Sequence, residues 1–460
     1  MTMVKSVGVP ELAGLGSYRD AARIGLGVDE SVRRLLRYQW TARRAMMTLV
    51  AHLPSTPTWE IKGAMALHQW LLAEHVDSLR ARVGEMRHPV PELNAAPDPA
   101  LDAWCEELLR AESEVELVAG VYGVAIPALL AAVDGHLATT NLLVDHPTRR
   151  VLRFMALELG EIAEWGATTL AAVRRRGAPE AAEATAWVDH LGRYLARAGG
   201  IAGPAPDAAE APPPARATGP FVPDLHPRRD ERFRGQYNFV FAAQDLYTDT
   251  SLPADERNLA LLCKRTLEMD VAEMMASVMV ERPDLPWEFH HDYARQLWDE
   301  LRHAMMGSVA FEARGVDWTR IPLNVGFSLR LNLHATPLER QTMLFGIEQS
   351  LMPATTGKRY EYEVAREAGD ELSAHFQDYD WADEVLHAQI GRRWLKREGI
   401  GGDEAVARAG EIHGRTWAAL DAYRDREPQV DWWDDLCRAV LGKPSADRSS
   451  HDGRPRVTSA

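Results

Sequence analysis

Apolar residues recur at helical spacing through most of the chain, with Ala, Leu, Glu and Arg filling many positions between them. Runs in which apolar and polar residues alternate, as in half-buried strands, are hard to find. The pattern therefore predicts an all-α protein. A chain of 460 residues is too long for one compact core, so we expect two domains.

The helical pattern is interrupted in one place. From Ala198 to Pro227 the sequence is rich in Pro, Ala and Gly, and such a segment buries little surface. We therefore predict a helical domain over residues 30–198, a linker over 199–232 and a second helical domain over 233–442. The polar stretch 443–460 has no apolar period and is expected to be disordered.

The two predicted domains look related in sequence. Three short matches follow one another in the same order, at offsets of 228 and then 223 residues. They pair Met46-Met47 with Met274-Met275, Tyr122-Gly123-Val124-Ala125 with Phe345-Gly346-Ile347-Glu348, and Glu161-Ile162-Ala163-Glu164 with Glu384-Val385-Leu386-His387. This order indicates an internal duplication, with a few residues inserted or lost in loops.

Composition and charge narrow the possible partners. The formal net charge of −15 is spread along the chain, which disfavours nucleic acid and anionic membranes because both require a basic face. The chain lacks a run of about eighteen apolar residues and a signal-peptide pattern, so we expect a cytoplasmic protein. Its three cysteines are widely spaced, which argues against a disulfide framework or a structural zinc site.

Two Glu-x-x-His motifs carry the strongest chemical signal, one at Glu300 and His303 and the other at Glu384 and His387. Residues i and i+3 lie on one face of a helix, so each Glu and His can reach the same metal ion. A further glutamate precedes each motif at a similar distance. Two antiparallel helices joined by a short loop would bring such residues to one level.

The resulting set is four carboxylates and two imidazoles from four helices, which predicts a site for two metal ions. Bridging carboxylates lower the repulsion between two divalent ions, and we expect Glu348 to serve both. Oxygen and nitrogen donors without thiolate favour iron, with manganese as an alternative. The predicted metal ligands, which are also the predicted catalytic residues, are Glu268, Glu300, His303, Glu348, Glu384 and His387.

An aspartate stands directly before each motif and is predicted to support it. A metal-bound histidine usually donates its other N–H group to a carboxylate, which fixes its tautomer. In a pseudo-twofold arrangement, Asp299 would reach His387, and Asp383 would reach His303.

Two further acidic residues leave alternatives open. Asp380 lies one turn before Glu384 and is a seventh ligand, a proton shuttle or a solvated acid. Glu273 is an alternative to Glu268, although its separation from Glu300 is only 27 residues, which is short for a full helix pair.

The segment from Ala368 to Trp394, AGDELSAHFQDYDWADEVLHAQIGRRW, resembles the last bundle helix of the ferritin-like di-iron carboxylate superfamily. The closest resemblance is to bacterial ferritin-like proteins of unassigned activity, and it covers roughly residues 256–397. It implies a four-helix bundle with a dinuclear iron or manganese site, and the duplication then implies two ferritin-like bundles. It does not imply one reaction, because the superfamily includes ferroxidases, peroxidases, hydroxylases, desaturases, N-oxygenases and radical-generating subunits.

The N-terminal domain lacks most of this ligand set. Trp40 stands where the repeat places Glu268, and Ala125 stands where it places Glu348. This domain is therefore predicted to keep the fold without the metal, and to support the active domain, cover its pocket or form a homodimer interface. An irregular site also remains open, with donors drawn from His68, His75, Glu158 and Glu161.

These features predict a non-heme di-iron oxidase or oxygenase that activates dioxygen to oxidise a small organic substrate. The sequence contains no motif for flavin, nicotinamide or iron–sulfur binding, so electrons would come from an external donor or from the substrate. The alternatives are a ferroxidase or iron-handling protein, a manganese catalase-like enzyme, and a helical scaffold with structural metal. The large, duplicated chain argues against a ferritin cage, and costly buried carboxylates argue against a scaffold.

Overall fold

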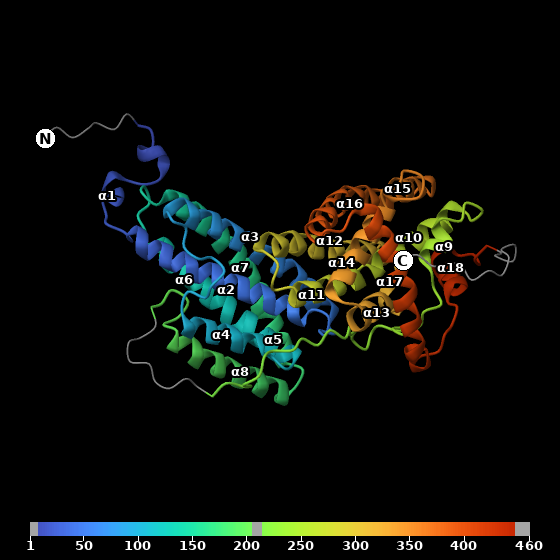
Figure 1. The fold of residues 1–460 in the computed structure, drawn as a ribbon, viewed down its shortest axis with the longest axis horizontal. Coiled ribbons are helices and arrows are strands. Elements are labelled where there is room, and N and C mark those ends of the chain that lie inside the picture. Colours follow the sequence, from blue (N-terminus) through green and yellow to red (C-terminus); the bar gives the residue numbers. More distant parts are fainter. Residues whose placement is uncertain (1–7, 205–213, 447–460) are drawn as a thin grey trace. The chain divides into compact units, whose positions relative to one another are not determined.

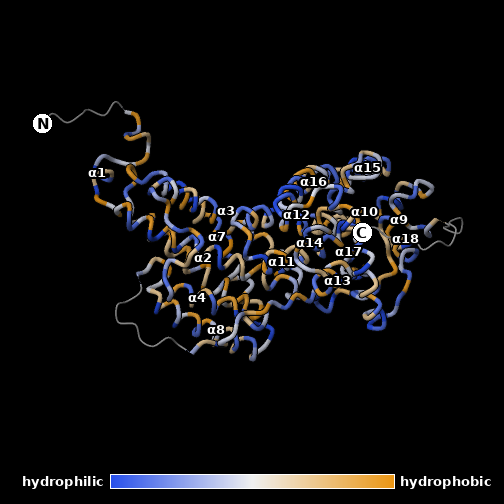
Figure 2. The backbone as a smooth tube through the Cα atoms, viewed as in Figure 1, coloured by the Kyte–Doolittle hydropathy of each residue, from blue (hydrophilic) through white to orange (hydrophobic). Residues whose placement is uncertain are grey.

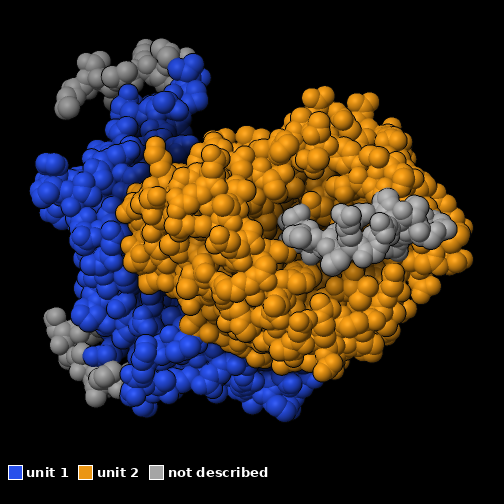
Figure 3. Space-filling view, turned by 45° about the vertical axis from the view of Figure 1, so that its right-hand side comes forward, with its two compact units in different colours: residues 1–49, 71–222 blue, residues 50–70, 223–460 orange. Residues whose placement is uncertain are grey.

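A computed structural model of the chain describes residues 8–204 and 214–446. These residues form helices joined by loops and turns, and none of them lies in a β-strand (Figure 1). The predicted all-α class is therefore confirmed. The chain divides into two compact units: residues 1–49 with 71–222 form unit 1, and residues 50–70 with 223–460 form unit 2 (Figure 3).

Unit 1 contains most of the helices that precede the predicted linker. Within it, α6 packs against α7, and α8 packs against α4 and α5. Hydrophobic and hydrophilic residues are interspersed along these helices (Figure 2), as expected for helices with one face in the core. The elements up to residue 204, of which residues 50–70 belong to unit 2, are η1 (Glu11–Gly14), α1 (Tyr18–Ala21), α2 (Val28–His52), α3 (Trp59–Met86), α4 (Pro99–Leu109), α5 (Glu114–Gly120), the π-helix η2 (Val121–Ala125), α6 (Ile126–Thr139), α7 (His146–Arg174) and α8 (Ala178–Arg197).

One helical stretch of unit 1, Glu114–Thr139, has the length and apolar composition that would allow it to cross a membrane. It joins α5, η2 and α6. Of its apolar window, 67% is buried inside the protein, and a core helix meets the same criteria.

Unit 2 is arranged around α12 and α16, two long helices that pack against each other. Helix α12 also packs against α11, α11 packs against α14, and α14 packs against α16, so these contacts close a ring. The elements are α9 (Ala243–Tyr247), α10 (Ala254–Leu267), α11 (Met269–Glu281), α12 (Trp287–Glu312), η3 (Trp318–Arg320), α13 (Gly326–His334), α14 (Pro337–Ser350), α15 (Lys358–Glu367), α16 (Glu371–Arg397), α17 (Gly402–Trp417), η4 (Ala418–Arg426) and α18 (Trp433–Leu441).

Local sequence explains where several helices of unit 2 begin. At the start of α14, Thr336 and Glu339 exchange side-chain and backbone hydrogen bonds in a capping box, with proline at the next position. The Asp370 side chain accepts a hydrogen bond from the Ser373 backbone N–H and so caps α16. Helices α10 and α11 meet at Glu268, which is the boundary residue of both.

The predicted linker 199–232 is divided between the units. Its part up to Val222 belongs to unit 1, where Arg216 pairs with Glu116 and lies 4.0 Å from the centre of the Trp187 ring. The part from Pro223 belongs to unit 2, in which Arg229 is buried. The expectation that this segment buries little was wrong in these places, because its arginines pair with acids on the helices. Residues 205–213, and 447–460 of the predicted tail, lie outside the described residues.

The boundary of the first predicted domain also differs from the structure. Residues 50–70, which comprise the end of α2, the loop and the start of α3, belong to unit 2. In that unit the Gln69 side chain donates a hydrogen bond of 2.7 Å to the Ala294 carbonyl of α12. A domain boundary chosen from composition does not separate residues 50–70, because the helical pattern continues through them.

Candidate metal centre

The six predicted ligands come together in the interior of unit 2. Each side chain belongs to a residue that is at most 7% exposed. One stands at the break between α10 and α11, two lie on α12, one lies near the end of α14 and two lie on α16. In chain order they are Glu268, Glu300, His303, Glu348, Glu384 and His387.

Their donor atoms form two groups that can each hold a metal ion. The first group is Glu268, His303, Asp380 and Glu384, and the second is Glu300, Glu348, Glu384 and His387. Within each group one donor atom from every residue lies within 4.8 Å of the others. Glu384 belongs to both groups and thus takes the shared position that we expected for Glu348.

Each of the six residues has one buried donor atom without a hydrogen-bond partner among the described residues. A buried polar atom without a partner costs about 1–3 kcal/mol, so six of them in one place require an explanation. Coordination to metal would satisfy atoms of this kind. The atoms are Glu268 Oε2, Glu300 Oε1, His303 Nδ1, Glu348 Oε2, Glu384 Oε2 and His387 Nδ1.

The opposite nitrogen of each imidazole is held by an aspartate from the other motif. His303 Nε2 lies 3.1 Å from Asp383 Oδ2, and His387 Nε2 lies 3.3 Å from Asp299 Oδ2. Both cross pairs that the sequence predicted are therefore present. With Nε2 engaged in this way, the free Nδ1 atom of each ring faces the carboxylates of its group.

Arginine side chains hold the two aspartates in place. Arg302 Nη2 lies 2.6 Å from Asp299 and 2.7 Å from Asp383, and Arg295 Nε lies 2.8 Å from Asp299. Burial opposes ionisation of Asp299, but hydrogen bonds from His387 and Arg295 hold its pKa well below the usual value. The aspartate is thus a charged acceptor for the imidazole N–H.

Charge is distributed unequally over the two groups. In the second group, burial and the neighbouring Glu384 raise the pKa of Glu348 well above its usual value, and burial raises that of Glu300. In the first group, burial opposes ionisation of Asp380, but Arg265 and Lys358 hold its pKa below the usual value. Two basic side chains that lie outside the sequence motifs, Arg265 and Lys358, thus belong to this site.

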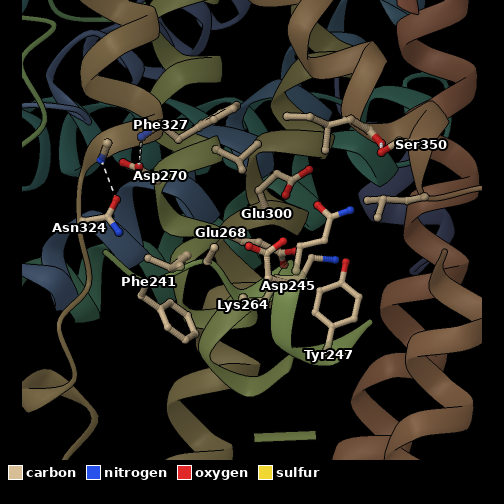
Figure 4. Close-up of a pocket in the computed structure, with 18 of the residues that line it drawn as sticks. Phe241, Asp245, Tyr247, Lys264, Glu268, Asp270, Glu300, Asn324, Phe327 and Ser350 are labelled. Carbon is tan, nitrogen blue, oxygen red and sulfur yellow. Dashed lines mark hydrogen bonds between the residues drawn. The ribbon is translucent and has the colours of Figure 1, made fainter. Parts of the chain in front are cut away.

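A cavity of about 250 Å³ opens beside the two groups, and Figure 4 shows Glu268 and Glu300 within its lining. Glu348 and Glu384 also line it, so four of the predicted ligands face this space. Much of the remaining lining is apolar, as is common in pockets for small organic molecules. The apolar part includes Phe239, Phe241, Val271, Phe327, Leu351 and Trp417.

Asp380 is a buried member of the site. Its exposed fraction is 0%, and its two carboxylate oxygens lie 3.0 and 2.9 Å from Lys358 Nζ. It also lies 3.3 Å from His303 Nδ1. The solvated-acid interpretation was therefore wrong, because α15 covers the side of α16 from which Asp380 projects.

Glu273, the alternative to Glu268, belongs to neither group. It is fully buried and forms ion pairs with Lys62 and Arg229, and Ser328 Oγ donates to it at 3.2 Å. Its 27-residue spacing from Glu300 thus corresponds to a different charge cluster. Within the part of the chain that the structure describes, both groups suited to metal lie in unit 2.

The irregular N-terminal site finds no support in the described residues. His75 Nε2 pairs with Glu158 at 3.0 Å, but no third donor joins them in a metal-holding group. Trp40, which replaces the first glutamate of the repeat, donates its indole N–H to Asp102 at 3.2 Å.

Unit 2 therefore defines an all-helical protein with a buried pair of carboxylate–histidine groups beside an apolar cavity. Comparison with family models, curated proteins and solved structures finds no match to the chain. The ferritin-like resemblance thus rests on the residues that carry it.

Proposed function

We propose that this chain is a ferritin-like, non-heme iron oxidase or oxygenase that uses dioxygen to oxidise a small organic substrate. The observation that carries the proposal is the set of six buried, unpartnered donor atoms arranged around Glu384. A metal site would explain why so many buried donor atoms without a hydrogen-bond partner lie next to one another. The proposed bundle consists of α10–α11, α12, α14 and α16, with unit 1 as its degenerate relative.

The donor set fits iron and, as an alternative, manganese. It contains carboxylates and imidazoles but no thiolate, and the supporting aspartates orient the imidazoles. When bound, such a metal supplies the redox chemistry with dioxygen that amino-acid side chains lack. The chain's own residues would hold the ion, exclude water and bind the substrate, and an external donor would supply electrons.

The cavity favours an organic substrate over iron storage. Its aromatic and aliphatic lining would bind an apolar molecule of modest size with a reacting carbon near Glu300 and Glu348. A path for hydrated iron would instead favour a polar lining throughout. Ferroxidase and catalase-like activities remain the competing assignments for the same ligands.

The test is an anaerobic titration with Fe²⁺ followed by rapid mixing with oxygen and absorbance detection. We expect iron oxidation that stops at the capacity of the site, together with a transient absorption whose decay is faster with apolar organic compounds of suitable size. Repeated oxidation of many iron ions per chain would contradict the proposal and indicate iron handling. Rapid disproportionation of hydrogen peroxide by the manganese-loaded protein would favour the catalase-like alternative.

A second prediction concerns the aspartate behind His387, whose Nε2 atom lies 3.3 Å from Asp299. Replacing Asp299 by Asn keeps the shape but weakens the acceptor, so we expect metal affinity to fall by about 10–100-fold. Affinity would be measured with Mn²⁺ by chelator competition, alongside the thermal midpoint of unfolding. The matched control is Glu288→Gln, an exposed position on the same helix. Equal affinities in the two variants would show that Asp299 does not act through His387.

A further inference from the structure

A lysine side chain projects into the first group of donor atoms. Lys358 is the first residue of α15 and is fully buried. Its Nζ atom lies 2.9 Å from Glu384 Oε1, within hydrogen-bonding distance of both oxygens of Asp380, and 3.9 Å from Glu268 Oε1. Three of the four residues of this group therefore surround one ammonium.

A second cation lies beside it. Arg265 is 1% exposed and stands one helical turn before Glu268, whose Oε1 atom it contacts at 2.8 Å. It also forms an ion pair with Asp380. Lys358 and Arg265 together carry two positive charges, the same charge as one divalent metal ion.

Glu384 connects the second group to Lys358 as well, whereas Glu300 and Glu348 have no such cation beside them among the described residues. Among the described residues, Glu300 and Glu348 form no ion pair with lysine or arginine. Glu300 contacts His387, and Glu348 contacts His387, Gln296 and Glu384. Burial is costly for a carboxylate that lacks a cation. A metal ion held by this group would offset that cost.

The two oxygens of the shared Glu384 carboxylate have different neighbours. Its Oε1 atom contacts the Lys358 ammonium, whereas its Oε2 atom has no hydrogen-bond partner and lies 3.4 Å from His387 Nδ1. Distances of 2.9–3.0 Å are those of charge-assisted hydrogen bonds. Asp380 offers the first group only oxygens that already contact the ammonium, so a metal bound there would have to displace it.

We propose that Lys358 takes the place of one metal ion, so that the protein binds a single ion tightly, in the group formed by Glu300, Glu348, Glu384 and His387. This inference refines the proposed oxidase site and depends on it. It replaces two equivalent metal positions with one metal position next to a fixed ammonium. The metal, when bound, would supply the chemistry with dioxygen, and the ammonium would place a positive charge and hydrogen-bond donors beside it.

The test compares the full-length wild-type chain with Lys358→Met by titration with Mn²⁺. Metal per chain would be measured by elemental analysis, and electron paramagnetic resonance would separate isolated ions from magnetically coupled pairs. We expect about one tightly bound ion with an isolated-ion spectrum in the wild type, and about two coupled ions in K358M. Lys358→Arg, which keeps the charge, is expected to retain the wild-type stoichiometry.

The outcomes separate this inference from the function on which it rests. Two ions bound with equal affinity by the wild type would overturn the role of Lys358 while leaving the oxidase proposal standing. One ion in a folded K358M variant would also overturn it. No metal bound by the wild type would refute the metal site itself. If K358M does not fold, Lys358→Gln removes the charge with less change in polarity, and the wild-type titration still decides.

Discussion

Replacing Glu384 by alanine is expected to remove all tightly bound metal from the protein. Glu384 is the one residue that belongs to both donor groups, and its Oε2 atom is one of the six unpartnered buried atoms. Without it the second group keeps two glutamates and one histidine and loses the carboxylate that also contacts Lys358. The loss should exceed that caused by Glu348→Ala, since Glu348 belongs to one group and has no such contact.

The measurement is metal content per chain after anaerobic reconstitution with Fe²⁺ and removal of weakly bound ions. Glu371→Ala is the matched control, because this exposed glutamate lies on the same helix and should leave the metal content unchanged. Circular dichroism and thermal unfolding would establish that the variant is folded. Glu384 would lose its assigned role if folded E384A protein kept the metal content of the control.

Replacing Glu273 by alanine is expected to lower the free energy of unfolding by about 3–5 kcal/mol. Its carboxylate is fully buried and neutralises two buried cations, Lys62 and Arg229. Burial opposes ionisation of Glu273, but these two cations lower its pKa, so the charged form is the one that the fold retains. The variant leaves Lys62 and Arg229 without this partner in the interior, although Asp270 still contacts Arg229 at 3.4 Å.

Unfolding by urea, followed by circular dichroism, would measure this loss. Glu60→Ala is the control, because the exposed pair of Glu60 with Arg232 should contribute less than about 1 kcal/mol. Metal content per folded chain should remain close to that of the wild type. A cost for E273A as small as that of the control would show that the buried cluster does not stabilise unit 2, whereas a loss of metal would return Glu273 to the ligand set.

Local sequence determined the helical class and the main donors of the candidate site. Helical spacing of apolar residues predicts helices wherever they occur, because the period of 3.6 residues is a property of the backbone. The i and i+3 spacing likewise places Glu300 with His303, and Glu384 with His387, on one face of a helix without any knowledge of tertiary contacts. The roles of Asp299 and Asp383 could also be predicted from the sequence. Each directly precedes the glutamate of its motif, and a side chain at that position projects toward a neighbouring helix.

Only the tertiary structure decided which cations lie beside the carboxylates of the site and which residue the two donor groups share. Lys358 reaches Asp380 across 22 residues of sequence, and Lys62 reaches Glu273 across 211. A buried lysine and an exposed lysine look the same in a single sequence, so neither contact could be predicted from spacing. The contact between Arg265 and Glu268 could have been predicted from the sequence, because the two residues are three positions apart on a helix. The contribution of residues 50–70 to unit 2, the shared position of Glu384 and the ammonium in the first group all depend on the packing of distant segments, which the short-range periodicity of a sequence does not record.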